Sequence, residues 1–118
     1  MIQFPGIVKE LKTHLDDFEK MTDVIGLLES MAAISSFRAM MPAYTIPVLK
    51  KSEKGFLTME EGYHPMISKP VKNSIKVERG VLITGSNASG KSTFLKTVAI
   101  NAILAQTIHT CMAQRYES

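Results

Sequence analysis

Glycine, lysine and hydroxyl residues are spaced between positions 85 and 93 in a way that suits phosphate binding. Residues 85–93 read GSNASGKST and match the pattern G-x-x-x-x-G-K-[ST] at every fixed position. In such a loop the backbone N–H groups turn inward and form a nest for an anion. The sequence therefore predicts a P-loop that binds the phosphates of ATP or GTP.

Each fixed position of this loop has its own physical role. Gly85 and Gly90 lack a Cβ, so the backbone can approach a phosphate closely. Lys91 is expected to reach the β- and γ-phosphates as a mobile point charge. Ser92 is expected to bind Mg²⁺ through its hydroxyl, and Thr93 to support the α-phosphate. The predicted nucleotide contacts are Gly85, Ser86, Asn87, Ala88, Ser89, Gly90, Lys91, Ser92 and Thr93, with Ser92 also the metal ligand. The alternative is a glycine-rich turn without a ligand.

The segments on both sides of the loop favour the nucleotide-binding interpretation. Residues 81–84, Val-Leu-Ile-Thr, are continuously apolar, which predicts a strand at the centre of a parallel sheet. From Gly90 to about Gln106 the chain is predicted to be a helix that is apolar on most faces, and therefore buried. The N-terminal end of that helix would add its positive dipole to the phosphate site.

Two further strands are predicted before the loop, at residues 56–60 and 74–77. Between them, residues 62–65 read Gly-Tyr-His-Pro and predict a turn, because the residue before a proline avoids the helical region. We expect His64 to form a local hydrogen bond in that turn rather than to act as a base. Cys111 is expected to be a small buried hydrophobe.

The N-terminal third of the chain has the apolar spacing of an amphipathic helix over residues 7–41. One long helix and two shorter helices both fit, because Thr22 and Asp23 could cap a new start. The segment either packs on a core or forms a lever or coiled-coil arm. Pro42 and Pro47 end the helical region. The apolar stripe consists of Val8, Leu11, Leu15, Phe18, Met21, Ile25, Leu28 and Ala32.

The overall composition is that of a globular protein, with 45% hydrophobic and 21% charged residues among 118. A net charge of +3 is weak evidence for a nucleic-acid partner. The single cysteine excludes an internal disulfide, and no secretory signal or membrane-spanning run is visible, so a cytoplasmic location is expected.

With these segments in place, the sequence resembles the MutS family of DNA mismatch repair ATPases. The resemblance is carried by EGYHPMI at 61–67, VLITGSNASGKSTFLKTVAINAILAQ at 81–106 and CMAQ at 111–114. It implies an α/β fold: the N-terminal portion of an ABC-type P-loop NTPase domain at residues 48–118, incomplete, preceded by a helical arm at 1–47 that resembles the end of the family's lever. It also implies that Val71 and Lys72 lie beside the adenine.

The resemblance also has departures that bear on function. Ala88 and Ser89 stand where mismatch-recognising members commonly carry Met and Gly, so the loop is closer to divergent MutS-like branches, and Met112 replaces a common proline. No apolar run ending in Asp-Glu follows Lys91. The resemblance implies ATP, Mg²⁺, DNA and a second ATPase domain as partners of a parent ATPase. We expect no catalytic residue in this segment and no hydrolysis by it alone. The alternative is a non-catalytic interaction or regulatory module.

Overall fold

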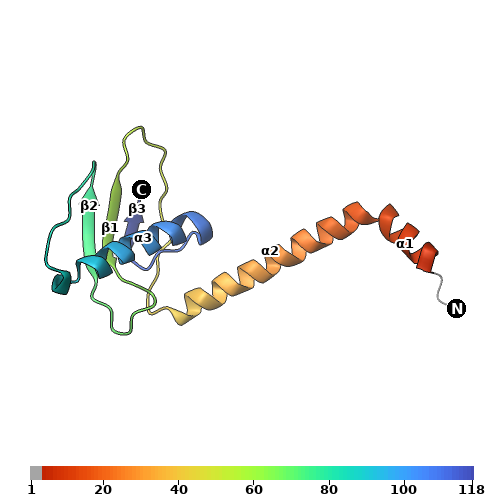
Figure 1. The fold of residues 1–118 in the computed structure, drawn as a ribbon, viewed down its shortest axis with the longest axis horizontal. Coiled ribbons are helices and arrows are strands. Elements are labelled where there is room, and N and C mark those ends of the chain that lie inside the picture. The colour runs from red at the N-terminus through yellow and green to blue at the C-terminus, as the bar shows by residue number, and fades with distance from the viewer. Residues whose placement is uncertain (1–3) are drawn as a thin grey trace. The chain divides into compact units, whose positions relative to one another are not determined.

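The computed structural model describes residues 4–118, and these divide into two units that meet between Ser36 and Phe37. The first unit is helical. The second contains the strands and the predicted phosphate loop (Figure 1). No helix among the described residues is long and apolar enough to span a membrane.

The helical segment consists of two helices, α1 (Phe4–Thr13) and α2 (Leu15–Met40), with a turn at His14 between them. Thr13 Oγ1 donates to the carbonyl of Lys9 at 2.9 Å, a bond that weakens and bends helices at this type of position. Of the two alternatives, the structure thus has two helices, but the break lies at His14 and not at the possible start at Thr22. The Thr22 hydroxyl donates to the carbonyl of Phe18, four residues earlier, within a continuous helix.

The apolar stripe of these helices is exposed to solvent. No residue of α2 is buried, and the exposed fractions of the stripe's large side chains run from 44% at Val8 to 60% at Leu28. Tertiary packing normally stabilises such a face. The described residues of this unit therefore do not cover their own apolar stripe.

The second unit contains a three-stranded antiparallel sheet in the order β2-β1-β3. Its strands are β1 (Leu57–Gly62), β2 (Asn73–Val77) and β3 (Arg115–Glu117). The first two confirm the predicted strands at 56–60 and 74–77. Met59 pairs with Ile75 on one side and with Tyr116 on the other, which places the apolar side chains of all three strands on one face.

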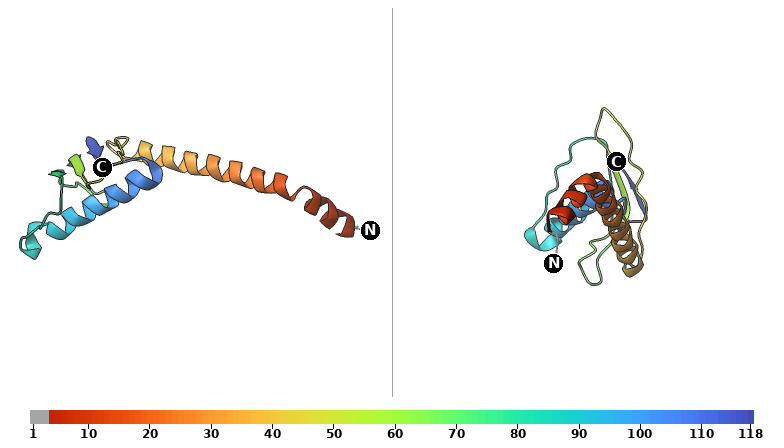
Figure 2. Two further views of the ribbon diagram at one scale, coloured as in Figure 1. Left: turned by 90° about the horizontal axis from the view of Figure 1, so that it is seen from above. Right: turned by 90° about the vertical axis from the view of Figure 1, so that its right-hand side faces the viewer.

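That apolar face is covered by α3 (Lys91–Ile108), which crosses the sheet (Figures 1 and 2). The helix confirms the prediction for residues 90–106, but the expectation that most of its faces are buried is wrong. Only Thr97, Asn101 and Ala105 are buried, one residue per turn along a single stripe. The core that this stripe closes consists of Met59, Ala105, Cys111, Ala113 and Tyr116.

The predicted central strand at residues 81–84 does not form. This segment is irregular, and its apolar side chains are open to solvent, with Val81 57% and Leu82 87% exposed. A strand that is apolar on both faces is stable only between paired neighbours inside a sheet. In the described chain, residues 81–84 have no such neighbours. The three strands present pair with one another in the antiparallel sheet beside α3.

Residues 45–50, which follow α2, are hydrogen-bonded to residues 111–118. Thr45 and Cys111 exchange two backbone hydrogen bonds of 2.9 Å, and the Val48 N–H donates to the Tyr116 carbonyl at 2.9 Å. The segment thereby covers the outer edge of β3, which would otherwise expose unpaired backbone groups.

Candidate nucleotide-binding site

The predicted phosphate loop lies at the N-terminal end of α3. Ser86 is extended, residues Asn87–Ser89 form a single 3₁₀ turn (η1), and Gly90 adopts the left-handed conformation with φ 80° before the helix begins. A glycine suits this position because other residues are strained at such a φ. The turn is closed by Ser89, whose N–H and hydroxyl both donate to the Ser86 carbonyl, at 3.1 and 2.6 Å.

Gly85 is required for a different reason. A Cβ at this position would lie 2.9 Å from the Ser89 hydroxyl oxygen, so any larger residue would displace the side chain that closes the turn. The loop is compact enough that its two fixed glycines are both needed sterically, one for close approach and one for its backbone angle.

The start of α3 presents unpaired donors. The first hydrogen bond of the helix runs from the Phe94 N–H to the Gly90 carbonyl at 2.9 Å. Within the described chain, the N–H groups of Lys91, Ser92 and Thr93 have no backbone acceptor, and no side chain caps the helix. The first turn also contains no acidic residue. Free N–H groups together with the helix dipole make this end suitable for an anion.

Lys91 adds a full positive charge over the same loop. Its Nζ donates to the Gly85 carbonyl at 3.2 Å, which folds the side chain back across the loop. The carbonyl is a weaker partner than a phosphate oxygen, since charge-assisted bonds between two ions are stronger. Ser92 and Thr93 are exposed on the first turn beside it. The structure thus places all nine predicted loop residues together around one helix end.

Val71 and Lys72 lie in the exposed segment before β2. Val71 is 79% exposed, and its carbonyl accepts a hydrogen bond from the Asn73 side chain at 3.3 Å. In the described part of the chain, no hydrogen bond or ion pair joins either residue to the phosphate loop. Their assignment to the adenine stays a prediction.

Two other predicted roles are confirmed. The His64 ring nitrogen Nδ1 accepts a hydrogen bond from the Met66 N–H at 3.1 Å, within the turn. Cys111 is fully buried, and burial raises the pKa of its thiol to about 12. A thiol with that pKa is almost entirely protonated at neutral pH, so it is not a nucleophile.

The sequence reasoning missed Asn101, which holds α3 in place. Its side-chain oxygen accepts from the Met112 N–H at 2.7 Å, and its side-chain nitrogen donates to the Tyr63 and Thr97 carbonyls at 3.2 and 3.0 Å. The residue is fully buried. The sequence did contain a sign of this role, since Asn101 is a single amide within an otherwise apolar helical run. An amide in a buried position needs hydrogen-bond partners, so it indicates a structural contact.

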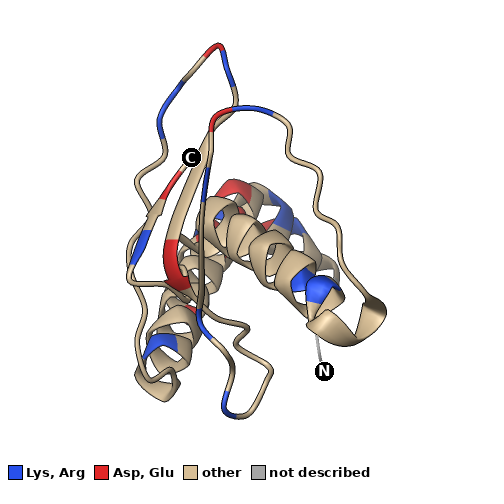
Figure 3. Cartoon of the chain, turned by 90° about the vertical axis from the view of Figure 1, so that its left-hand side faces the viewer, with Lys and Arg blue, Asp and Glu red and all other residues tan. Residues whose placement is uncertain are grey.

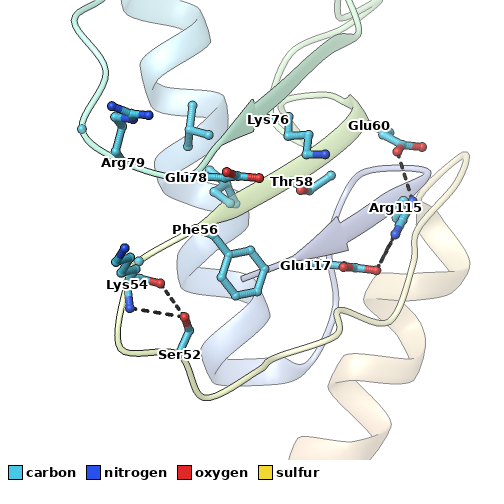
Figure 4. Close-up of a pocket in the computed structure, with 14 residues that line it drawn as sticks. Ser52, Lys54, Phe56, Thr58, Glu60, Lys76, Glu78, Arg79, Arg115 and Glu117 are labelled. Carbon is cyan, nitrogen blue, oxygen red and sulfur yellow. Dashed lines mark hydrogen bonds and ion pairs between the residues drawn. The ribbon is translucent and has the colours of Figure 1, made fainter.

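The face of the sheet opposite α3 carries a cavity of about 1250 Å³ (Figure 4). None of the predicted phosphate-loop residues lines it. Arg115 donates to Glu117 at 2.7 Å and lies 3.5 Å from Glu60, while Lys50 lies 3.2 Å from Glu117. Hydrogen bonds from Arg115 and Lys50 lower the pKa of Glu117. Charges of both signs lie on this face (Figure 3), since β1 contributes Glu60, β2 contributes Lys76, and β3 contributes Arg115 and Glu117, so it has no single preferred ligand charge.

Comparison with known proteins finds relatives in the MutS family. The chain is 27% identical over 110 residues to the DNA mismatch repair protein MutS of Thermotoga petrophila, a match covering 87% of this chain and 13% of the relative. For MutS of Listeria monocytogenes serotype 4a the identity is 36% over 109 residues, covering 85% and 12%. The chain resembles the MutS family. The human MutS protein homolog 4 is 29% identical over 108 residues, covering 85% and 11%. No protein-family model matches the chain.

The MutS-like sequence extends over most of the chain but corresponds to a small part of each relative. The chain spans about one eighth of the length of the curated MutS relatives it matches. The resemblance predicted from residues 61–67, 81–106 and 111–114 is confirmed. The residues present form an incomplete domain of mixed helix and antiparallel sheet.

Proposed function

We propose that residues 85–93 bind the phosphates of ATP, in the N-terminal portion of an ABC-type ATPase domain. The observation that carries this proposal is the start of α3, where three unpaired N–H groups and the Lys91 ammonium surround one exposed loop. The negatively charged triphosphate of a nucleotide is the ligand chemistry that such a loop accepts best.

Ser92 is the proposed ligand of Mg²⁺. The hydroxyl lies on the first turn of α3, one residue after the lysine, and is exposed. A hydroxyl at this place in a P-loop supplies one oxygen ligand to the Mg²⁺ that bridges the phosphates. Val71 and Lys72, in the exposed segment before β2, are proposed to lie beside the adenine.

The parent protein is proposed to be a MutS-like, DNA-directed ATPase that works in the cytoplasm and closes its sites between two ATPase domains. Its relatives are named for DNA mismatch repair. Hydrolysis needs a carboxylate near the metal and a group that orients water. The carboxylates that come closest by position are Glu60, which pairs with Arg115 on the far face of the sheet, and Glu61, which is exposed. This segment would therefore bind ATP without turning it over alone.

The test is titration of a fluorescent ATP analogue with Mg²⁺ against the wild type and Lys91→Ala. We expect the variant to bind at least about tenfold more weakly, since it loses a charge-assisted contact. Lys96→Ala is the matched control, because Lys96 is exposed on the same helix and forms no ion pair among the described residues. Equal affinities of the wild type and Lys91→Ala, with both proteins folded, would contradict the proposal.

A non-catalytic interaction module is the second candidate function. It is favoured by the exposed apolar stripe of α1 and α2, which includes Leu15 and Phe18. This candidate predicts that the chain self-associates or binds a partner through the stripe and does not bind ATP. Sedimentation of the wild type and Phe18→Glu, each with and without Mg-ATP, separates the two functions.

A further inference from the structure

Arg38 connects the last turn of α2 to the C-terminal end of α3. Its Nε donates to the Thr110 hydroxyl at 2.9 Å, and its Nη2 donates to the His109 carbonyl at 3.1 Å. The guanidinium also lies over the Tyr44 ring, 5.3 Å from its centre. Three contacts on one planar group fix its position from several directions.

The end of α3 needs such a partner. The helix closes with His109 in the left-handed conformation, and its last turn contains no basic residue. Free carbonyls at a helix C-terminus are stabilised by a cation or a donor. Thr110, which receives the Arg38 bond, is fully buried. Arg38 therefore supplies from another helix the cation that α3 itself lacks.

Neighbouring bonds make this connection rigid. Ala43 and the Tyr63 hydroxyl are hydrogen-bonded, and Thr45 pairs with Cys111 through two backbone bonds of 2.9 Å. The segment that follows Arg38 is thus attached to the residues that follow α3. A change at Arg38 would shift the helix end rather than only remove a surface contact.

Distance decides how Arg38 could act on the phosphate loop. The 18 residues of α3 span about 27 Å at 1.5 Å per residue. Screening over about 8 Å at physiological salt removes nearly all direct attraction between charges that far apart. An effect of Arg38 on the loop must therefore pass through the position of the helix and not through the electric field.

We propose that Arg38 is a positioning residue for the nucleotide site: by fixing the C-terminal end of α3, it sets the place of the phosphate loop at the other end. The inference rests on the proposed ATP binding at residues 85–93. It assigns to Arg38 a role that depends on guanidinium geometry, so a lysine, which keeps only the charge, cannot replace it.

The experiment measures the affinity of the 118-residue chain for a fluorescent ATP analogue with Mg²⁺ at low temperature. Wild type, Arg38→Lys and Arg38→Gln are compared, with Arg79→Gln as the control, an exposed arginine without an ion pair among the described residues. We expect both Arg38 variants to bind about three- to tenfold more weakly, at low and high salt alike. Arg79→Gln should bind like the wild type.

A second readout separates positioning from stability. In the wild type, ATP should slow hydrogen exchange at residues 108–110, far from the loop, and in the Arg38 variants it should not. If an Arg38 variant does not fold, Thr110→Val removes the same bond with little change of shape. If the folded Arg38 variants bind ATP with unchanged affinity, or if Arg38→Lys binds it like the wild type, the inference about Arg38 is wrong but the proposed function stands. Failure of the wild type to bind ATP would overturn the proposed function together with it.

Discussion

Replacing Asn101 by Ala is expected to destabilise the Phe37–Ser118 unit by about 3 kcal/mol. The substitution leaves the Met112 N–H and the Tyr63 carbonyl without the partners that they have at 2.7 and 3.2 Å. An unpaired buried polar group costs about 1–3 kcal/mol. A unit of about 80 residues has a total stability of about 4–12 kcal/mol, so the loss is a large fraction of it.

The assay follows from the positions of the aromatic residues. The chain has no tryptophan, and its three tyrosines, Tyr44, Tyr63 and Tyr116, all lie in the second unit. Tyrosine fluorescence during urea or thermal unfolding therefore reports this unit without a signal from α1 or most of α2. A loss of about 3 kcal/mol should lower Tm by roughly 12–24 °C.

Two variants sharpen the test. Asn73→Ala is the matched control, since that amide makes only a local bond of 3.3 Å to the Val71 carbonyl. It should cost less than about 1 kcal/mol. In Asn101→Asp the carboxyl would face the Thr97 and Tyr63 carbonyls, and burial would raise its pKa in the folded state. Stability is then lost as the pH rises above the unfolded value of about 3.9, so the deficit relative to wild type should widen from pH 4 to pH 7. Equal unfolding midpoints for Asn101→Ala and Asn73→Ala would refute the reasoning.

Three further predictions concern the loop and the buried thiol. Ser92→Ala should weaken ATP binding in Mg²⁺ much more than in EDTA, because the hydroxyl is the proposed oxygen ligand of the ion. Equal losses of affinity in both buffers would refute that role. Phosphate release by the purified chain should stay below about 1 per second, and faster turnover that Lys91→Ala abolishes would reveal a catalytic carboxylate in this segment. Burial raises the pKa of Cys111 to about 12, above its ordinary value of 9.0. Stability should therefore fall as the pH rises from 9 towards 12, and Cys111→Ala should lose less of it in unfolding followed by circular dichroism, while burial of Tyr116, which also raises its pKa, contributes equally in both proteins.

The elements that the sequence predicted well are those specified by local chemistry. Pro42 and Pro47 follow the end of α2 at Met40, and the strands near Met59 and Ile75 have the alternation that a one-sided sheet requires. The phosphate loop is predicted from local chemistry too, because its pattern lies within nine consecutive positions, and its contact with a phosphate stays a prediction.

The features that the sequence did not reveal depend on residues far apart in the chain. Arg38 meets Thr110 across 72 positions, and Asn101 meets Tyr63 across 38. Nothing in the local pattern of either residue indicates its partner. The burial of α3 was overestimated because an apolar face shows only that a surface could be covered, whereas Leu95 and Ile103 are 47% and 57% exposed.

The irregular segment at 81–84 bears directly on the affinity of the proposed nucleotide site. No backbone hydrogen bond within the described chain involves these residues, so the loop is held from the α3 side, which includes the bond from Lys91 to the Gly85 carbonyl, and by the bonds between Ser86 and Ser89. A loop held at one end occupies its binding geometry only part of the time. The apparent Kd then exceeds the intrinsic Kd by the inverse of that fraction. A partner strand that paired with 81–84 would remove this penalty and would also cover Val81 and Leu82, so strand pairing and ATP affinity should rise together.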